Sequence, residues 1–112
     1  MYGGPGADHF VWEEIADTGI TIPTMDTVAD FDPAQIDKID LHAIDADGTV
    51  LGNQDFTFIG DASTPFTAPG QISFIQLSGD TYIVLNTNAD PTADAMIQVS
   101  GIHAVDAGWF VL

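Results

Sequence analysis

The sequence contains no cysteine and almost no basic residue. Lys38 is the single lysine or arginine among 112 residues, against 17 aspartates and glutamates, and the formal net charge is -16. Without basic side chains the chain has nothing with which to displace the counterions of nucleic acid, and it repels anionic membranes. Without cysteine it has neither a nucleophilic thiol nor the disulfides with which many small secreted domains compensate for a small core. Nucleic-acid binding, anion clamping by arginine and thiol catalysis are therefore excluded.

Long apolar runs are also missing. No stretch approaches the roughly 20 residues of a membrane span, so we expect no membrane insertion. Residues 1–10 lack the basic and apolar regions of a Sec signal peptide, so an exported protein would need its address elsewhere. Hydrophobic residues still make up 46% of the chain, enough for a modest core. Its length predicts a single domain or the last part of a larger one.

Short alternating apolar segments, separated by turn signals, predict an all-β fold. The clearest strands are expected over residues 56–59, 72–77, 82–85 and 96–99. Ser78-Gly79-Asp80 is typical of a hairpin turn between two of them. Shorter strands are expected up to Trp12 and over residues 27–31 and 109–112. No segment carries a helical apolar stripe longer than a turn or two.

Residues 3–11 match the nonapeptide pattern G-G-x-G-x-D-x-U-x, in which U is a large apolar residue. Glycines let the backbone turn tightly and aim its carbonyl oxygens inward. Asp8 adds a carboxylate. Phe10 starts a strand, and we expect its side chain to point into the core. Hard oxygen ligands in a flexible turn suit calcium better than zinc or copper. A divalent cation would also reduce the self-repulsion of so acidic a chain.

The order of the motifs resembles the C-terminal region of RTX (hemolysin-type repeat) proteins, in particular the segment after the calcium β-roll of serralysin-type metalloproteases. The resemblance is carried by residues 8–11 (DHFV), 26–31 (DTVADF) and 37–41 (DKIDL), followed by 43–45, 56–60 and the apolar end after Asp106. It covers essentially the whole chain. It implies the end of a parallel calcium β-roll over residues 1–26, running into an antiparallel, sandwich-like cap over residues 27–112.

The resemblance also implies a calcium site. In the family, the last ion of the roll is held by carbonyls of the glycine turn and by four aspartates. These are the repeat aspartate, an aspartate nine residues later and the aspartates that open the next two segments. The matching residues are Gly4, Gly6, Asp8, Asp17, Asp26 and Asp37. Two departures stand out: residues 33–35 replace a glycine turn, and a single nonapeptide is present. Because a roll ion lies between two turns, we expect upstream repeats to complete the site.

Each of these aspartates, taken alone, also fits a solvated loop or a turn cap. Taken as a set, together with the large net charge, they favour calcium binding.

A second set of oxygen side chains occupies positions 1, 3, 5 and 9 of a loop that begins like an EF-hand. These residues are Asn86, Asn88, Asp90 and Asp94. Pro91 stands where such a loop has glycine, and Ile97 stands where it has glutamate. These differences favour a plain polar connection over a second calcium site.

No spacing indicates catalysis. His9, His42 and His103 are far apart and lack the His-Glu-x-x-His arrangement of zinc enzymes. Glu13 and Glu14 are adjacent, so on a strand they would point to opposite faces. We expect the histidines to be surface or strand-face residues and the large aromatic residues to be core.

The C-terminus combines Asp106 with the apolar residues 109–112. The resemblance implies a secretion signal for a type I ABC exporter, and a plain core strand is the alternative.

We therefore predict a secreted, non-catalytic, calcium-dependent folding and export module, attached to upstream repeats or to a catalytic domain. An exposed strand edge could also pair with a second copy of the chain. The alternatives are an extracellular adhesin or carbohydrate-binding module with structural calcium, and an acidic domain adapted to high salt.

Overall fold

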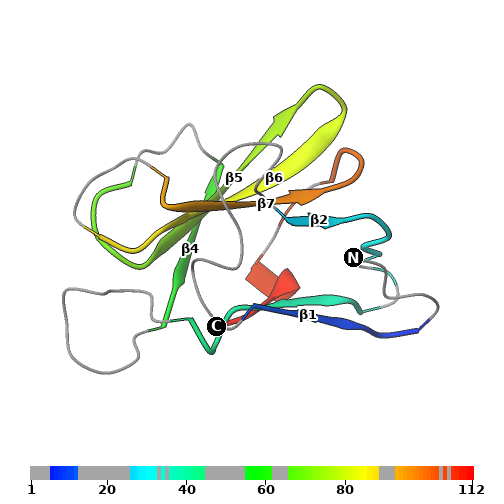
Figure 1. Ribbon diagram of the computed structural model, residues 1–112, viewed down its shortest axis with the longest axis horizontal. Coiled ribbons are helices and arrows are strands. Elements are labelled where there is room, and N and C mark those ends of the chain that lie inside the picture. Colours follow the sequence, from blue (N-terminus) through cyan, green and yellow to red (C-terminus); the bar gives the residue numbers. More distant parts are fainter. Residues whose placement is uncertain are drawn as a thin grey trace.

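The computed structural model describes residues 6–12, 26–32, 34, 36–44, 55–61, 66–88, 93–103, 105 and 107–112 (Figure 1). In chain order the elements are β1 (His9–Val11), β2 (Asp26–Val28), β3 (Lys38–Asp40), β4 (Thr57–Asp61), β5 (Gln71–Leu77), β6 (Asp80–Asn86), β7 (Ala95–Val99), η3 (Ala107–Trp109) and β8 (Phe110–Val111). The all-β prediction is confirmed. In the part of the chain that is described, no helix is long and apolar enough to cross a membrane.

The strands form two sheets. The three-stranded sheet has the order β1-β3-β8, and all its pairs are parallel. The five-stranded sheet has the order β2-β7-β6-β5-β4; its central pairs are antiparallel, and the pairs at both ends are parallel. The predicted antiparallel cap is therefore a mixed structure. Strands joined by a hairpin run antiparallel, whereas a strand that arrives after a crossover can pair in parallel.

The first three strands alternate between the two sheets. β1 and β3 are parallel neighbours in the three-stranded sheet, whereas β2 lies in the five-stranded sheet beside β7. Figure 1 shows β1 and the strands beside it below the five-stranded sheet. One apolar cluster joins both sheets and contains Phe10, Ile39 and Phe110 from the first and Val28, Ile83, Leu85 and Ile97 from the second.

Aromatic side chains make direct contacts within this core. The rings of Phe58 on β4 and Phe110 on β8 lie 5.3 Å apart, so they connect the two sheets. Phe31 contacts Trp109 at 4.4 Å and Phe10 at 6.2 Å. Of the aromatic residues expected in the core, Phe56, Tyr82 and Trp109 are buried, whereas Phe58 and Phe74 are partly buried against the apolar cluster.

The hairpin predicted at Ser78-Gly79-Asp80 is confirmed. β5 and β6 pair up to Leu77 and Asp80, and the two residues between them have positive φ values of 52° and 86°. Such a pair of left-handed residues matches the right-handed twist of the strands that it joins. Two shorter predicted strands differ from the observed ones: the chain bends at Ala29, and residues 107–109 form a helical turn before β8.

Candidate metal centre

Asp8 and Asp37 come together at the start of two neighbouring strands. Asp8 precedes β1 and Asp37 precedes β3, and the register pairs His9 with Lys38. Because the strands are parallel, the residues before them lie side by side. The backbone N–H of Asp8 donates to Oδ1 of Asp37 at 2.9 Å, and the N–H of Lys38 donates to the carbonyl of Asp8 at 2.7 Å. Two predicted ligands, 29 residues apart in sequence, therefore share one turn region.

Asp32 also belongs to this turn region. Its backbone N–H donates to Oδ2 of Asp37 at 2.9 Å, and its own Oδ1 accepts the N–H of Ala34 at 2.9 Å. Each carboxylate oxygen of Asp37 thus accepts one backbone N–H, and Asp37 is only 2% exposed. The sequence analysis did not select Asp32. The signal that could have found it is an aspartate that opens a turn and caps the residue two positions later.

One oxygen in this turn region is left without a partner. Oδ2 of Asp8 is buried and accepts no hydrogen bond. Lys38, the single basic residue of the chain, donates its Nζ to the carbonyl of Gly108. A buried carboxylate oxygen that lacks a donor is unfavourable by at least about 1–3 kcal/mol. A hard cation would satisfy it, so this oxygen and the neighbouring Asp37 fit the chemistry of calcium.

The other predicted ligands have different surroundings. Oδ2 of Asp26 accepts the indole N–H of Trp12 at 2.9 Å, which satisfies the polar group of a side chain that is only 1% exposed. Gly6 is exposed and has a φ of 100°, as a tight turn requires. Gly4 and Asp17 lie outside the described residues. Among the residues that are described, no group of three or more histidine, cysteine, aspartate or glutamate side chains is arranged to hold a metal ion.

The structure also brings together part of the second predicted set of oxygen ligands, in the connection between β6 and β7. Asp94 accepts the backbone N–H of Thr87 at 2.7 Å and its hydroxyl at 3.1 Å, and it accepts Nδ2 of Asn88 at 3.0 Å. Asn86 is only 1% exposed, and its Nδ2 donates to the carbonyls of Ala68 and Asn88. Asp90 lies outside the described residues.

A third polar group lies on the outer face of the three-stranded sheet. Asp40 is 7% exposed and accepts hydrogen bonds from the ring Nδ1 and the backbone N–H of His42. Nδ1 of His9 lies 3.8 Å from its other oxygen. Burial alone would raise the pKa of Asp40, but the hydrogen bonds from His42 and the charges of His42 and His9 outweigh burial and lower this pKa.

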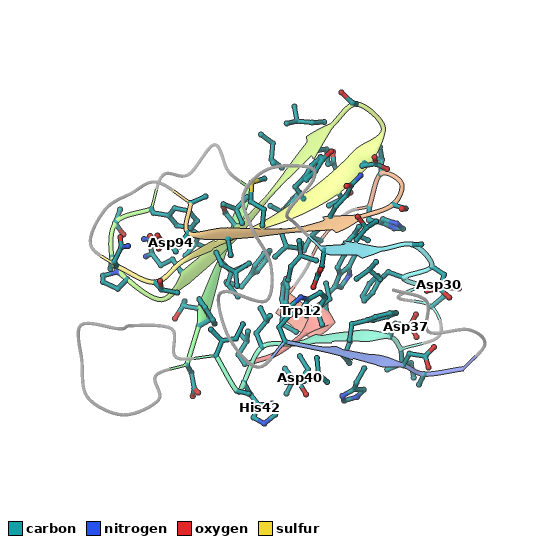
Figure 2. All side chains as sticks on the ribbon, in the orientation of Figure 1. Trp12, Asp30, Asp37, Asp40, His42 and Asp94 are labelled. Atoms are coloured by element: carbon teal, nitrogen blue, oxygen red, sulfur yellow. The ribbon has the colours of Figure 1, made fainter. Side chains whose placement is uncertain are left out.

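Both histidines are exposed, as predicted for surface residues: His9 lies on β1 and His42 lies in the turn after β3. Figure 2 shows His42 beside Asp40. Their link to Asp40 was not predicted. Asp40 ends β3 and accepts the backbone N–H of His42 in the turn that follows, so their contact is local. The position of His9 beside them depends on the pairing of β1 with β3.

Comparison with protein families completes the description of the site. The family model described as the peptidase M10 serralysin C terminal matches residues 2–112. The match therefore spans every strand from β1 to β8 and both candidate metal sites. No match was found among curated proteins.

Proposed function

The chain belongs to the family of serralysin C-terminal domains, and on this premise we propose that it is a non-catalytic, calcium-binding folding and export module. The family forms the non-protease, C-terminal part of serralysin-like proteins, which type I systems secrete and which in general depend on calcium. Membership of this family makes the chain a secretion-related module. Its own calcium site and its own lack of catalysis are the parts that we propose.

The buried, unpartnered Oδ2 of Asp8 is the observation that carries the calcium proposal. Asp8 and Asp37 would hold the ion, because they already meet where β1 and β3 begin. The family pattern supplies further ligands, namely the carbonyls of the glycine turn at Gly4 and Gly6 and the side chains of Asp17 and Asp26. The ion would neutralise carboxylates that otherwise repel one another, and it would thereby stabilise the start of both strands.

Two sheet edges support a role as the cap of a longer roll. Among the described strands, β1 lies at one edge of the three-stranded sheet and β2 at one edge of the five-stranded sheet. The chain passes from one sheet to the other and back through β1, β2 and β3, as a roll would require. Upstream strands with the same winding would pair with both edges and would bring a second turn to the ion. A second copy of the chain is the other partner that such edges could recruit.

The C-terminal end supports export before folding. Residues 110–111 form β8, which pairs with β3, and the N–H of Leu41 donates to the carbonyl of Val111 at 2.9 Å. Trp109 and Phe110 are buried. A folded domain therefore holds its terminal apolar residues within the sheet, so an exporter would have to bind them while the chain is still open. Calcium-poor cytosol would keep it open.

Outside the cell, millimolar calcium would complete folding. Extracellular calcium modules have dissociation constants of about 10⁻⁴ to 10⁻³ M. At such affinities each site adds on the order of 1 kcal/mol to the free energy of unfolding by linkage, and reduced self-repulsion adds to that. Folding after export would oppose movement back through the exporter.

Thermal melting followed by circular dichroism tests this proposal. We expect millimolar calcium to raise the melting temperature above its value in EDTA, and magnesium to do so much less. Asp8→Asn should remove much of the calcium increment, whereas Asp55→Asn, which alters an exposed residue outside the site, should keep it. An unchanged melting temperature, or equal effects of calcium and magnesium, would contradict the proposal.

The structure does not favour a carbohydrate-binding module. Among the described residues, the large hydrophobic side chains that are exposed are Val11, Ile36, Leu77 and Ile102, and none is aromatic. A sugar-binding face usually presents an aromatic platform to solvent.

A further inference from the structure

The connection between β6 and β7 holds a polar cluster made of Asn86, Asn88 and Asp94. The backbone N–H of Asp94 donates to the carbonyl of Leu85 at 2.9 Å, so the two ends of the connection are joined. Figure 2 shows Asp94 at the opposite end of the molecule from Asp37. It is therefore a separate place from the turn region around Asp8.

The Asp94 carboxylate is oriented by neutral donors. Among the described residues, three hydrogen bonds reach it, two from Thr87 and one from the side chain of Asn88. None of these donors carries a positive charge, and the single basic side chain of the sequence is bonded to Gly108. A carboxylate offers about four lone-pair positions, so the contacts within the described residues leave one for a further ligand. The carboxylate is held in place, but its charge is not balanced by a cationic side chain.

The Asn86 amide supplies the second and independent observation. Its Nδ2 donates to the carbonyls of Ala68 at 3.2 Å and Asn88 at 3.0 Å, so the orientation of the amide is determined. Its Oδ1 is then left buried without a hydrogen-bond partner, in a residue that is 1% exposed. A buried acceptor without a donor costs about 1–3 kcal/mol. Because Nδ2 of Asn86 bonds to the carbonyl of Asn88, this amide lies against the loop that leads to Asp94.

We propose that Asn86, Asn88 and Asp94 form a second calcium site, independent of the one at Asp8 and Asp37. Amide and carboxylate oxygens are calcium ligands, and calcium accepts irregular arrangements of six to eight oxygens, whereas magnesium demands a near-ideal octahedron. The ion would satisfy Oδ1 of Asn86 and balance the charge of Asp94. Because Ile97 replaces the bidentate glutamate of an EF-hand, the dissociation constant should lie in the weak range of about 10⁻⁴ to 10⁻³ M.

Two-dimensional ¹H–¹⁵N NMR, recorded during a calcium titration of the whole chain, reports on this site alone. We expect the Thr87 amide and the Asn86 side-chain amide to shift and to saturate by about 10 mM calcium. Asp94→Asn should weaken this response at least tenfold, whereas Asp55→Asn should leave it unchanged. In Asp8→Asn the two signals should still respond, which separates this site from the proposed function.

Asn88→Ala provides a second variant in case Asp94→Asn fails to fold, because Asn88 is only partly buried. It should also weaken the calcium response, by a factor of several. The proposal is overturned if the two signals do not move, if both variants respond like the wild type, or if sodium or magnesium chloride at matched ionic strength causes the same shifts. In that case the partner of the Asn86 oxygen is an ordered water molecule.

Discussion

At the scale of single residues, Ile36 shows how the turn region around Asp37 is held. Its φ is +66°, a left-handed conformation that a β-branched residue rarely adopts. Its side chain is 64% exposed, so packing does little to compensate for the strain. The next residue, Asp37, must accept the N–H groups of Asp8 and Asp32. The strained backbone of Ile36 thus allows the Asp37 carboxylate to reach both N–H groups.

We expect Ile36→Gly to stabilise the protein. The left-handed conformation costs a non-glycine residue about 1–2 kcal/mol, and glycine loses about 0.5–1 kcal/mol of that gain through the entropy of the unfolded chain. The free energy of unfolding should therefore rise by about 0.5–1 kcal/mol in a urea titration. Ala34→Gly, two residues earlier and without a positive φ, is the control and should bring no gain. A less stable Ile36→Gly protein would contradict this explanation.

At the scale of elements, β3 connects the separate features of the three-stranded sheet. It lies between β1 and β8, and it begins directly after Asp37. Ile39 faces the core, whereas Asp40 lies on the outer face with His42 and with His9 of β1. The hydrogen bonds and charges around Asp40 therefore help to hold β1 against β3.

The lowered pKa of Asp40 predicts a loss of stability in acid. Because the folded-state pKa lies below the ordinary value of 3.8, the charged carboxylate stabilises the fold fully above that value. This contribution falls as the pH drops from 3.8 through the lower folded-state pKa. Asp40→Asn should thus destabilise the protein by about 1–2 kcal/mol at pH 6, and the difference from the wild type should vanish at the acid end.

Urea titrations of both proteins from pH 6 down to the acid transition measure this difference. Asp55→Asn serves as the matched control, since its carboxylate is exposed and should show a much smaller difference. A gap between wild type and Asp40→Asn that stays constant through the acid range would show that Asp40 acts by packing and not by charge.

At the scale of the whole molecule, compactness and charge oppose each other. The Cα radius of gyration is 13.1 Å, close to the roughly 13 Å of a folded chain of this length. The formal net charge is -16, so the folded state brings many carboxylates close together. Self-repulsion of this size favours the open chain unless cations reduce it.

Small-angle X-ray scattering should reveal this balance. In EDTA at low ionic strength we expect the radius of gyration to rise toward the roughly 34 Å of an unfolded chain of this length. Calcium should restore a compact particle, and potassium chloride at the same ionic strength should restore it less. An equal effect of both salts would support an acidic domain adapted to high salt, and a compact particle in EDTA would contradict a need for cations.

Local patterns were sufficient to predict part of this structure. The alternation along β5, β6 and β7 and the turn at Ser78-Gly79 are properties of neighbouring residues, so the hairpin could be predicted directly. The resemblance to a family then selected Asp8 and Asp37 as partners. Neither route predicted Asp32, Asp40 with its histidines, or the unpartnered oxygen of Asn86.

Composition and apolar alternation were enough to predict an acidic, all-β chain. Three features followed only from the folded structure: which sheet each strand joins, the parallel pairing of β2, β4 and β8, and the oxygen atoms that remain unsatisfied. The physical reason is that a period of two specifies the face of a side chain but not the neighbour of its strand. That neighbour depends on contacts between distant segments, such as Ile39 with Phe110, which no local pattern encodes.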